Sequence, residues 1–429
     1  MRGVRQLPKN EAREPGDGRD FRFFLTGQAI STFGDSFNHF ALPFIVFQAT
    51  GSELDLGAVA AVYYVPYVLF GLVGGAIADR YDRRKMMMAS DLARALLIGA
   101  IGFVGVFHTL PLAVVYGAIF IQSLLQIPSA AASFAAIPRM VPADNVPAAN
   151  IRFTSAQYVV QSVSPVAAAI CVTVMSPAAL LLVDAASFLV SFISLAAIRA
   201  PLGPDADRSL ALGQPARGTV RSLVADISEG LRWIWSSPIL RLVSVTVCAV
   251  NLLAPTVQAQ VFSYLSDLHA SDVQMGIFLG SAALGAAVLV MPVDRLRKTF
   301  SVKQLIWSSL ILRGMSVIAL SLAHNYVVAL LAYACMSGMA AIWTALTTVL
   351  RQQVIPSALM GRVASASMAV AWSVIPVGTL AGGWAASRGG TDSVFFFLGC
   401  GIATIACLFA WRARRWPSEA APGGSPGKT

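Results

Sequence analysis

The sequence predicts an all-α polytopic membrane protein, and its composition and its long uncharged runs carry that prediction. Of its 429 residues, 56% are hydrophobic and only 12% are charged, whereas soluble domains carry about 25% charged residues. Crossing the hydrocarbon core takes about 20 apolar residues. Five runs without Asp, Glu, Lys or Arg are long enough, at 56–78, 153–177, 242–266, 325–350 and 363–387. This pattern argues against a soluble enzyme.

Continuing along the chain, the apolar segments predict twelve spans. The chain begins with a charged, loop-like segment and not with a short apolar region and a small-residue cleavage site. We therefore expect the first span to be retained and not removed as a signal peptide. The predicted spans are 22–48, 56–78, 86–107, 111–136, 150–175, 178–198, 240–265, 273–293, 303–323, 325–350, 363–387 and 393–411.

The basic residues predict the orientation in the cell membrane. All but three of the 31 Lys and Arg residues fall in the two tails or in loops on one side; Arg94 and Arg313 lie inside spans and Arg388 lies on the opposite side. Because Lys and Arg are retained on the cytoplasmic side, both termini are expected there. The net charge of +10 follows from this bias and does not indicate a nucleic-acid partner.

The chain is organised as a repeat. The stretch Asp79-Arg80 after the second span is echoed by Asp294-Arg295 after the eighth, 215 residues later. We expect two parallel six-helix halves, 21–198 and 240–411, between a tail at 1–20 and a tail at 412–429. The connection 199–239 is cytoplasmic, and apolar residues at helical spacing in 219–236 predict an amphipathic helix on the inner membrane surface.

The loop after the second span carries a family resemblance. Gly75-Ala-Ile-Ala-Asp79-Arg80-Tyr-Asp82-Arg83-Arg84 resembles the signature loop of the major facilitator superfamily, in the form found in the branch of enterobactin exporters and macrolide efflux proteins. Three further stretches are similar to that branch: Gly27 to Asp35, Glu229 to Pro238 and Pro356 to Arg362. The resemblance covers residues 20–412 and implies the major facilitator fold.

The resemblance also implies a gating role for the signature loop. Its glycine allows close helix approach, and its aspartate suits the positive end of a neighbouring helix. The implied gating residues, which would lock one of two alternating-access states, are Gly75, Asp79, Arg80, Arg83 and Arg84. A plain basic loop that only sets topology is the alternative interpretation.

Polar stripes on several spans predict a substrate cavity, because polar faces of spanning helices turn toward the bundle interior. By resemblance, spans 1, 4, 7 and 10 would line it. For any single side chain, hydrogen bonding between helices is the alternative role. The candidate cavity residues are Gln28, Ser31, Asn38, Gln122, Gln126, Asn251, Gln258, Trp343 and Thr344.

Five ionisable residues fall inside spans, where each costs about 2.5–3.5 kcal/mol on insertion scales: Asp35, Asp91, Arg94, Asp184 and Arg313. Asp91 and Arg94 have the spacing of a helical ion pair, and Arg313 follows Arg94 by 219 residues, which favours a structural, snorkelling role for both arginines. Asp35 has no basic residue within one turn of its own helix. We expect Asp35 to be the proton-coupling carboxylate, with Asp184 as second candidate; a hydrogen-bonded structural aspartate is the alternative.

Together these features predict a secondary active transporter that exports amphipathic small molecules, such as a drug, siderophore or natural product, in exchange for protons. An uptake symporter, or a non-transporting sensor or assembly partner on the same fold, remains open. No enzyme motif, cofactor site or metal-ligand pattern is present in the sequence. The expected partners are a small-molecule substrate, protons and the lipid bilayer, and the chain is expected to be monomeric.

Overall fold

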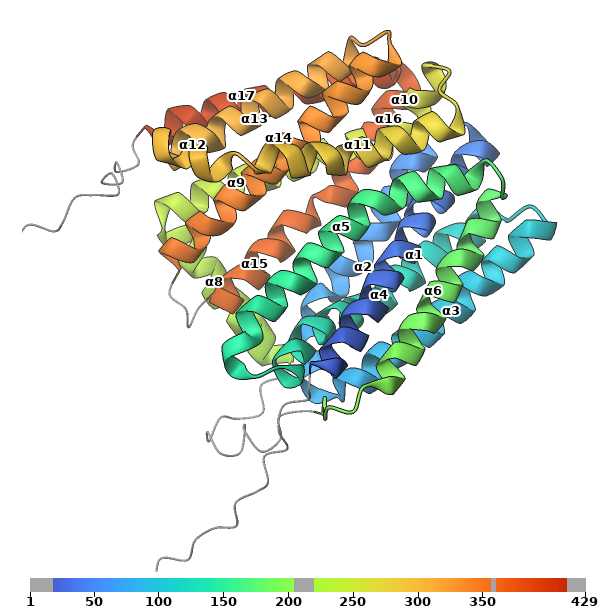
Figure 1. Cartoon of the computed structure of the whole chain (residues 1–429). Helices are drawn as coiled ribbons and strands as arrows, with labels where there is room; N and C mark the ends of the chain where they lie inside the picture. Colours follow the sequence, from blue (N-terminus) through green and yellow to red (C-terminus); the bar gives the residue numbers. More distant parts are fainter. Residues whose placement is uncertain (1–17, 204–219, 356–359, 415–429) are drawn as a thin grey trace, which may run out of the picture. The chain divides into compact units, whose positions relative to one another are not determined.

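The structure is a computed structural model that describes residues 18–203, 220–355 and 360–414, some side chains within these ranges excepted. Every regular element in these ranges is a helix, which confirms the all-α prediction (Figure 1). The helices are α1 (Arg19–Thr50), α2 (Glu53–Arg80), α3 (Arg83–Phe107), α4 (Leu112–Met140), η1 (Ala143–Asn145), α5 (Val146–Val172), α6 (Pro177–Ala197), α8 (Val220–Ser236), α9 (Pro238–Ala259), α10 (Val261–Asp267), α11 (Asp272–Val290), α12 (Val293–Thr299), α13 (Val302–Ser321), α14 (Tyr326–Val354), α15 (Met360–Ser373), α16 (Ile375–Gly389) and α17 (Thr391–Ala413).

Eleven stretches of helix in the described ranges are long and apolar enough to cross a membrane. Each matches a predicted span. The remaining predicted span corresponds to α1, which is 32 residues long but does not reach that apolarity. The reason is its polar stripe, whose Gln, Ser, Asp and Asn side chains lower the hydropathy of the helix.

Short polar side chains fix where several helices begin. Ser271 and Ser301 each form a capping box with the Gln three residues later, at the starts of α11 and α13. Such boxes satisfy two backbone N–H groups that have no partner inside the helix. Asp82 caps α3: its Oδ1 accepts from the backbone N–H groups of Arg84 (2.9 Å) and Lys85 (3.1 Å). The aspartate of the signature loop thus has a local structural role.

Two predicted spans are interrupted. The seventh is divided into α9 and α10 at Gln260, five residues beyond Pro255, the residue at which the sequence suggested a bend. The eleventh is divided into α15 and α16 at Val374, and Pro376 lies in the first turn of α16. A proline has no backbone N–H for the preceding turn, so a new helix begins there without losing a hydrogen bond that a continuous helix would make.

The described chain divides into two compact units. The N-terminal unit comprises the residues up to Ile45 and Leu69–Leu223, and the C-terminal unit comprises Val46–Val68 and the residues from Val224 onward. The helix α2 is therefore shared, and its first half packs inside the C-terminal unit. There Gln260 Nε2 donates to the backbone oxygen of Glu53 at 2.8 Å, and a Cβ on Gly57 would lie 3.2 Å from the Cα of Gly383.

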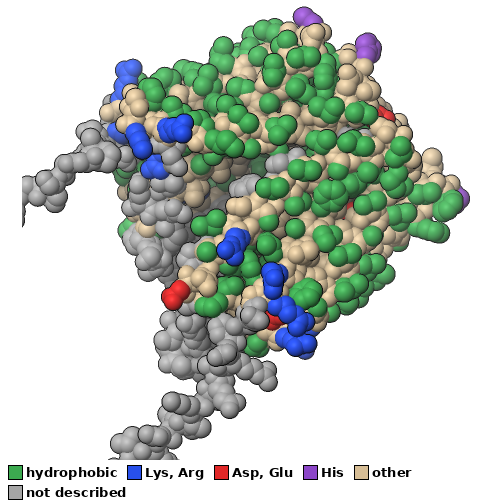
Figure 2. Space-filling model, viewed as in Figure 1, with side chains coloured by type: hydrophobic (Ala, Val, Ile, Leu, Met, Phe, Trp, Pro, Cys, Tyr) green, Lys and Arg blue, Asp and Glu red, His purple; other side chains and the backbone are tan. Residues whose placement is uncertain are grey.

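Each unit has its own pattern of helix pairs. In the N-terminal unit α3 packs along α6 and α4, and in the C-terminal unit α13 packs along α17 and α14 (Figure 1). Apolar side chains cover most of the visible surface, as expected for helices that face lipid. Within the C-terminal unit, Lys and Arg gather around α12, and histidines lie at the far end of the same helices (Figure 2).

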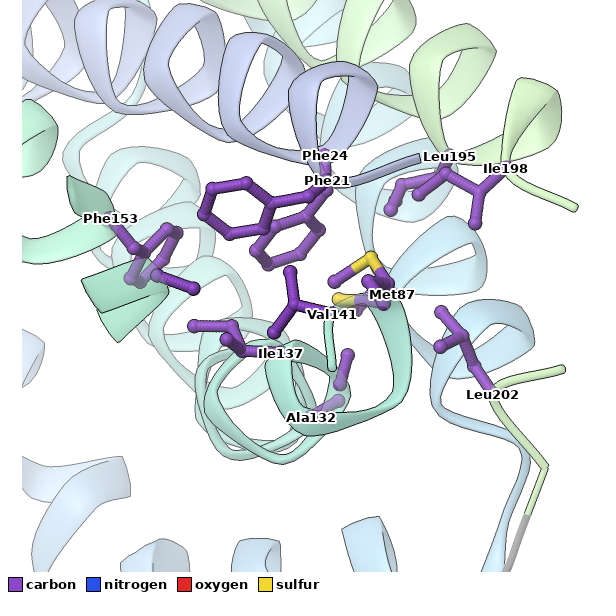
Figure 3. Packing of buried hydrophobic residues seen from close by; sticks show 13 residues of the cluster. Phe21, Phe24, Met87, Ala132, Ile137, Val141, Phe153, Leu195, Ile198 and Leu202 are labelled. Atoms are coloured by element: carbon purple, nitrogen blue, oxygen red, sulfur yellow. The ribbon is translucent and has the colours of Figure 1, made fainter. Parts of the chain in front are cut away.

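A cluster of apolar side chains closes one end of the N-terminal unit and joins α1, α3, α4, α5 and α6 (Figure 3). Phe24 of α1 stacks on Phe153 of α5 with ring centroids 5.4 Å apart. Met87, at the start of α3, is fully buried beside them. The cluster lies near the signature loop, so it fixes the helices from which that loop emerges.

One close helix contact yields a test of the packing. A Cβ atom on Gly285 of α11 would lie 2.6 Å from the carbonyl carbon of Ala334 in α14. We expect Gly285→Val to force the two helices apart and to lower the free energy of unfolding by about 1–3 kcal/mol. Thermal unfolding in detergent, followed by tryptophan fluorescence, measures the change.

The matched control is Gly117→Val in α4, where an added Cβ meets nothing within 4 Å. Equal unfolding midpoints for the two variants would contradict the close contact of α11 and α14.

Candidate functional site: a buried charged network

The candidate site is centred on an ion pair inside the N-terminal unit. An Nη atom of Arg94 on α3 donates to Oδ1 of Asp35 on α1, and their side chains are only 4% and 15% exposed. The guanidinium also lies over the ring of Phe188 on α6, 3.9 Å from its centroid. A guanidinium favours both partners, a carboxylate by charge and an aromatic face by its quadrupole.

This ion pair corrects two expectations from the sequence. Asp35 has no cation near it along α1, but α3 supplies one. Arg94 was expected to pair with Asp91 on its own helix and to snorkel, whereas it is buried and its ion pair is with Asp35. Asp91 instead has a hydrogen bond with Ser191 of α6. The physical reason is that a buried guanidinium gains most from a carboxylate that has no other strong donor.

Asp184 of α6 is fully buried in the same unit. The amide of Asn38 on α1 bridges two helices: its Nδ2 donates to Oδ2 of Asp184 at 2.9 Å and to Oε1 of Gln122 on α4 at 2.5 Å. Ser187 adds a further bond to Oδ1 at 3.4 Å. The structure therefore brings together both proposed coupling carboxylates and two of the proposed cavity residues.

Glycines on α1 make this arrangement possible. A Cβ on Gly34 would lie 2.5 Å from the Cβ of Ser187 and 2.8 Å from Oδ1 of Asp184. One turn and a half earlier, a Cβ on Gly27 would lie 2.6 Å from the hydroxyl of Ser194. Only glycine at these two positions lets α1 approach α6 closely enough for Asn38 to reach Asp184.

Further hydrogen bonds extend the network toward the signature-loop end. Gln28 donates to Ser191 at 3.4 Å and accepts from Ser133 at 3.2 Å, so it joins α1, α4 and α6. Thr32 donates to Gln157 of α5. Ser31 is buried on the same helix, and Gln126 of α4 is partly buried. Of the polar stripe predicted on α1, every member thus faces the interior of the unit.

The cavity candidates of the C-terminal unit form no comparable network among the described residues. Asn251 donates to the backbone oxygen of Ala371 at 2.8 Å, and Gln258 is exposed. Trp343 is 5% exposed and packs edge-on against Phe409, so it belongs to the core of the unit. Thr344 is exposed and bonds the backbone of its own helix.

The signature loop is described in part. The side chains of Gly75, Asp79 and Arg80 lie outside the described residues. Arg83 is buried and its Nη1 lies 3.5 Å from the backbone oxygen of Gly203, and Arg84 donates to the backbone oxygen of Ala196. Both arginines thus tie the start of α3 to the end of α6.

A helical bundle with apolar spans and a buried network of charged side chains defines a membrane transporter rather than an enzyme. The comparison with known families agrees. The chain belongs to the transmembrane secretion effector family of the major facilitator superfamily, whose family model matches residues 15–422.

Similar curated proteins place the chain in the efflux branch. Macrolide efflux protein A of Streptococcus pyogenes is 23% identical over 398 residues, which cover 90% of this chain and 94% of the relative. Multidrug efflux pump Tap of Mycolicibacterium fortuitum is 23% identical over 379 residues, which cover 85% and 88%. The resemblance found in the sequence is therefore confirmed.

Solved structures confirm the fold. A bacterial homologue of the human lysosomal transporter Spinster, in an inward-facing and unoccupied conformation, matches with a TM-score of 0.72 at 13% identity and covers 93% of this chain and 98% of that one. A bacterial homologue of the iron transporter ferroportin, in an inward-facing state, matches with a TM-score of 0.68 at 16% identity, covering 94% and 100%. The chain is thus a multi-pass membrane protein that takes a small-molecule substrate.

The ion pair of Asp35 and Arg94 predicts strongly unequal effects of single and double substitutions. Arg94→Gln leaves Asp35 without its cation and is expected to cost about 3–5 kcal/mol of stability. The double variant Asp35→Asn with Arg94→Gln removes both charges and is expected to recover most of that loss. Thermal unfolding of the wild type, both single variants and the double variant in detergent gives the coupling energy.

Arg152→Gln serves as control, because Arg152 is an exposed arginine of α5 in the same unit. Purely additive effects of the two single substitutions would show that the pair contributes nothing.

Proposed function

We propose that the chain exports amphipathic small molecules from the cell and draws its energy from protons that enter in exchange. The efflux relatives support the direction of transport. The few fixed charges within the spans support a substrate that is amphipathic and not highly charged. A macrolide antibiotic is the first substrate to test, since two of the similar proteins bear that name.

The observation that carries proton coupling is the charge count of the network. Asp35, Asp91 and Asp184 lie within electrostatic reach of one guanidinium, that of Arg94. With all three carboxyl groups ionised, the interior of the unit would hold two uncompensated negative charges. Because an uncompensated buried charge is costly, we infer that the network holds protons when it is closed to water and exchanges them when water reaches it.

In the proposed cycle Asp35 is the group whose proton is exchanged. A proton that binds the Asp35 carboxylate neutralises it and weakens its attraction for Arg94, which loosens α1 from α3. The guanidinium then remains within reach of Asp91, one turn earlier on α3. Release of the proton on the cytoplasmic side restores the ion pair. Since α1 also carries Gln28 and Asn38, protonation and substrate binding would act on one helix.

Alternating access completes the proposal. The signature loop would hold the closed state on its side of the membrane, as the family resemblance implies. Similar transporters have been captured inward-facing, which supports two-state operation of this fold. With the loop on the cytoplasmic side, both termini are cytoplasmic as well.

Substituting Asp35 tests the coupling role. Asp35→Asn mimics the protonated carboxyl group permanently, so we expect it to abolish uphill export while substrate binding persists. Asp35→Glu is expected to retain part of the activity because the titratable group survives. The measurement is accumulation of a labelled macrolide in inside-out vesicles with an acidic interior.

Asp144→Asn is the matched control, since it removes an exposed carboxylate in η1. Full uphill export by Asp35→Asn would overturn the assignment and move the coupling role to Asp184. Substrate expelled from the vesicles by the same gradient would instead indicate an uptake symporter.

The gating role of the signature loop has its own test. We expect Asp79→Asn or Gly75→Leu to shift the balance between the two access states and to slow transport at least about tenfold, with the protein still folded and inserted. Accessibility of single cysteines from each face of the membrane measures the balance.

Asp82→Ala in the same loop is the control: it removes the cap of α3 and is expected to cost about 1 kcal/mol of stability without changing the balance. Unchanged accessibility and transport in the Asp79 and Gly75 variants would leave the loop with a topological role alone.

A further inference from the structure

Arg313 lies in the middle of α13 without a counter-charge. It occupies the buried face of the helix, between neighbours that are at most 1% exposed: Ile306, Leu310, Val317 and Leu320. Its Nε is buried and has no hydrogen-bond partner among the described residues. A snorkelling arginine extends its guanidinium toward the membrane surface, whereas this one has its first donor atom sealed inside the bundle.

The same face exists in the N-terminal unit. In α3 the buried residues recur with the same spacing, 219 residues earlier, and both helices pack along the last helix of their own half, α6 or α17. Arg313 therefore takes the position of Arg94. The matched pairs are Met87 and Ile306, Asp91 and Leu310, Arg94 and Arg313, Ile98 and Val317, and Ile101 and Leu320.

The carboxyl groups around Arg94 have no counterparts around Arg313. The buried faces of α1 and α9 align at an offset of 216, shown by Phe24 with Leu240, Gly34 with Val250 and Ala41 with Val257. At that offset Asn251 replaces Asp35. Those of α6 and α17 align at 214, shown by Leu180 with Val394, Leu181 with Phe395 and Leu195 with Phe409, so Leu398 replaces Asp184. Leu310 replaces Asp91.

Nothing else in the C-terminal unit supplies the missing charge. The carboxylates whose side chains are described there lie in α8 or in the first or last turn of another helix: Glu53, Asp55, Glu229, Asp267, Asp272 and Asp392. Arg313 is about three turns from either end of α13. The unit has thus kept the guanidinium and replaced each carboxyl group by a neutral side chain.

A second donor without an acceptor lies on the neighbouring helix. The hydroxyl of Ser337 on α14 is buried without a hydrogen-bond partner among the described residues, and α14 packs along α13. The two helices are antiparallel around the short turn before Asn325. Counted from that turn, Arg313 and Ser337 lie 9 and 12 residues away, so their heights differ by about 4.5 Å.

We propose that Arg313, with Ser337, binds the carboxylate of an amphipathic molecule within the C-terminal unit. A guanidinium pairs with a carboxylate through two parallel hydrogen bonds, and its low hydration suits a site inside a bundle. The apolar face around Arg313 suits the hydrocarbon part of such a molecule. This inference deepens the proposed export function, on which it rests for the entry of small amphiphiles into the bundle.

The test is equilibrium binding to the purified full chain in phosphatidylcholine nanodiscs, without any gradient. The probes are dansyl-labelled undecanoic acid, ionised at pH 8, and its methyl ester. The wild type is expected to bind the acid at least about tenfold more tightly than the ester, because a hydrogen bond to a charged group contributes that much. Arg313→Gln is expected to remove the preference, Arg313→Lys to keep part of it, and Ser337→Ala to weaken it a few-fold.

Two further variants keep the test decisive. Asn251→Asp restores the carboxylate of the N-terminal unit and leaves Arg313 in place, so it should compete with the acid and abolish the preference even if Arg313→Gln misfolds. Arg412→Gln, at the exposed end of α17, removes a charge of the same unit and should change nothing.

Equal binding of acid and ester by the wild type, or an undiminished preference in Asn251→Asp or in folded Arg313→Gln, would overturn the site. Nanodiscs that contain phosphatidylglycerol distinguish the source of the anionic group: competition by this lipid would support the site with a lipid as its occupant. Because no transport is measured, the site can fail while export stands, and export can fail while the site stands.

Discussion

Burying charged side chains in an apolar bundle is the constraint on which the N-terminal unit depends. A guanidinium at the centre of a span is costly, and Arg94 offsets part of that cost with the carboxylate of Asp35 and the ring of Phe188. These partners lie on α1 and α6, so one interaction fixes the positions of three helices. The glycines of α1 follow from the same requirement, because any side chain at Gly34 would push α1 away from Asp184 and Ser187.

The helices were predictable from the sequence because their signals are local. Long apolar runs, capping serines and prolines all act within a few residues, and the predicted spans overlap the observed helices throughout the described ranges. The linker helix was predictable for the same reason: its apolar residues recur at helical spacing, and Ile234 of α8 packs in an apolar cluster with Leu240, Ile355 and Val363.

The partners within the site were not predictable from local signals. Periodicity placed Asp35 and Arg94 on buried faces but did not show that those faces meet, since the two residues are 59 positions apart. A charge balance over the six-helix half was the available signal: a lone cation among three carboxylates has to serve more than its neighbour along the helix. The bridging role of Asn38 depends on how closely α1 approaches α6, which sequence spacing does not reveal.

The two halves of the repeat have diverged in charge while retaining their packing. Apolar positions on the buried faces of α3 and α13 correspond one to one, because close packing constrains the volume of every side chain there. The acidic positions are free of that constraint and differ. Titratable groups are therefore concentrated in one half of a molecule whose helices follow the same plan in both.

The boundary between the compact units does not coincide with the boundary between the repeats. Residues 46–68 come from the first repeat but pack in the C-terminal unit, where Glu53 and Gly57 lie against Gln260 and Gly383. The segment duplicated in sequence is thus not the segment that folds as one body. Cutting the chain in the connection 199–239 would separate two polypeptides, but it would not separate two domains, because the first polypeptide would still carry part of the second one's core.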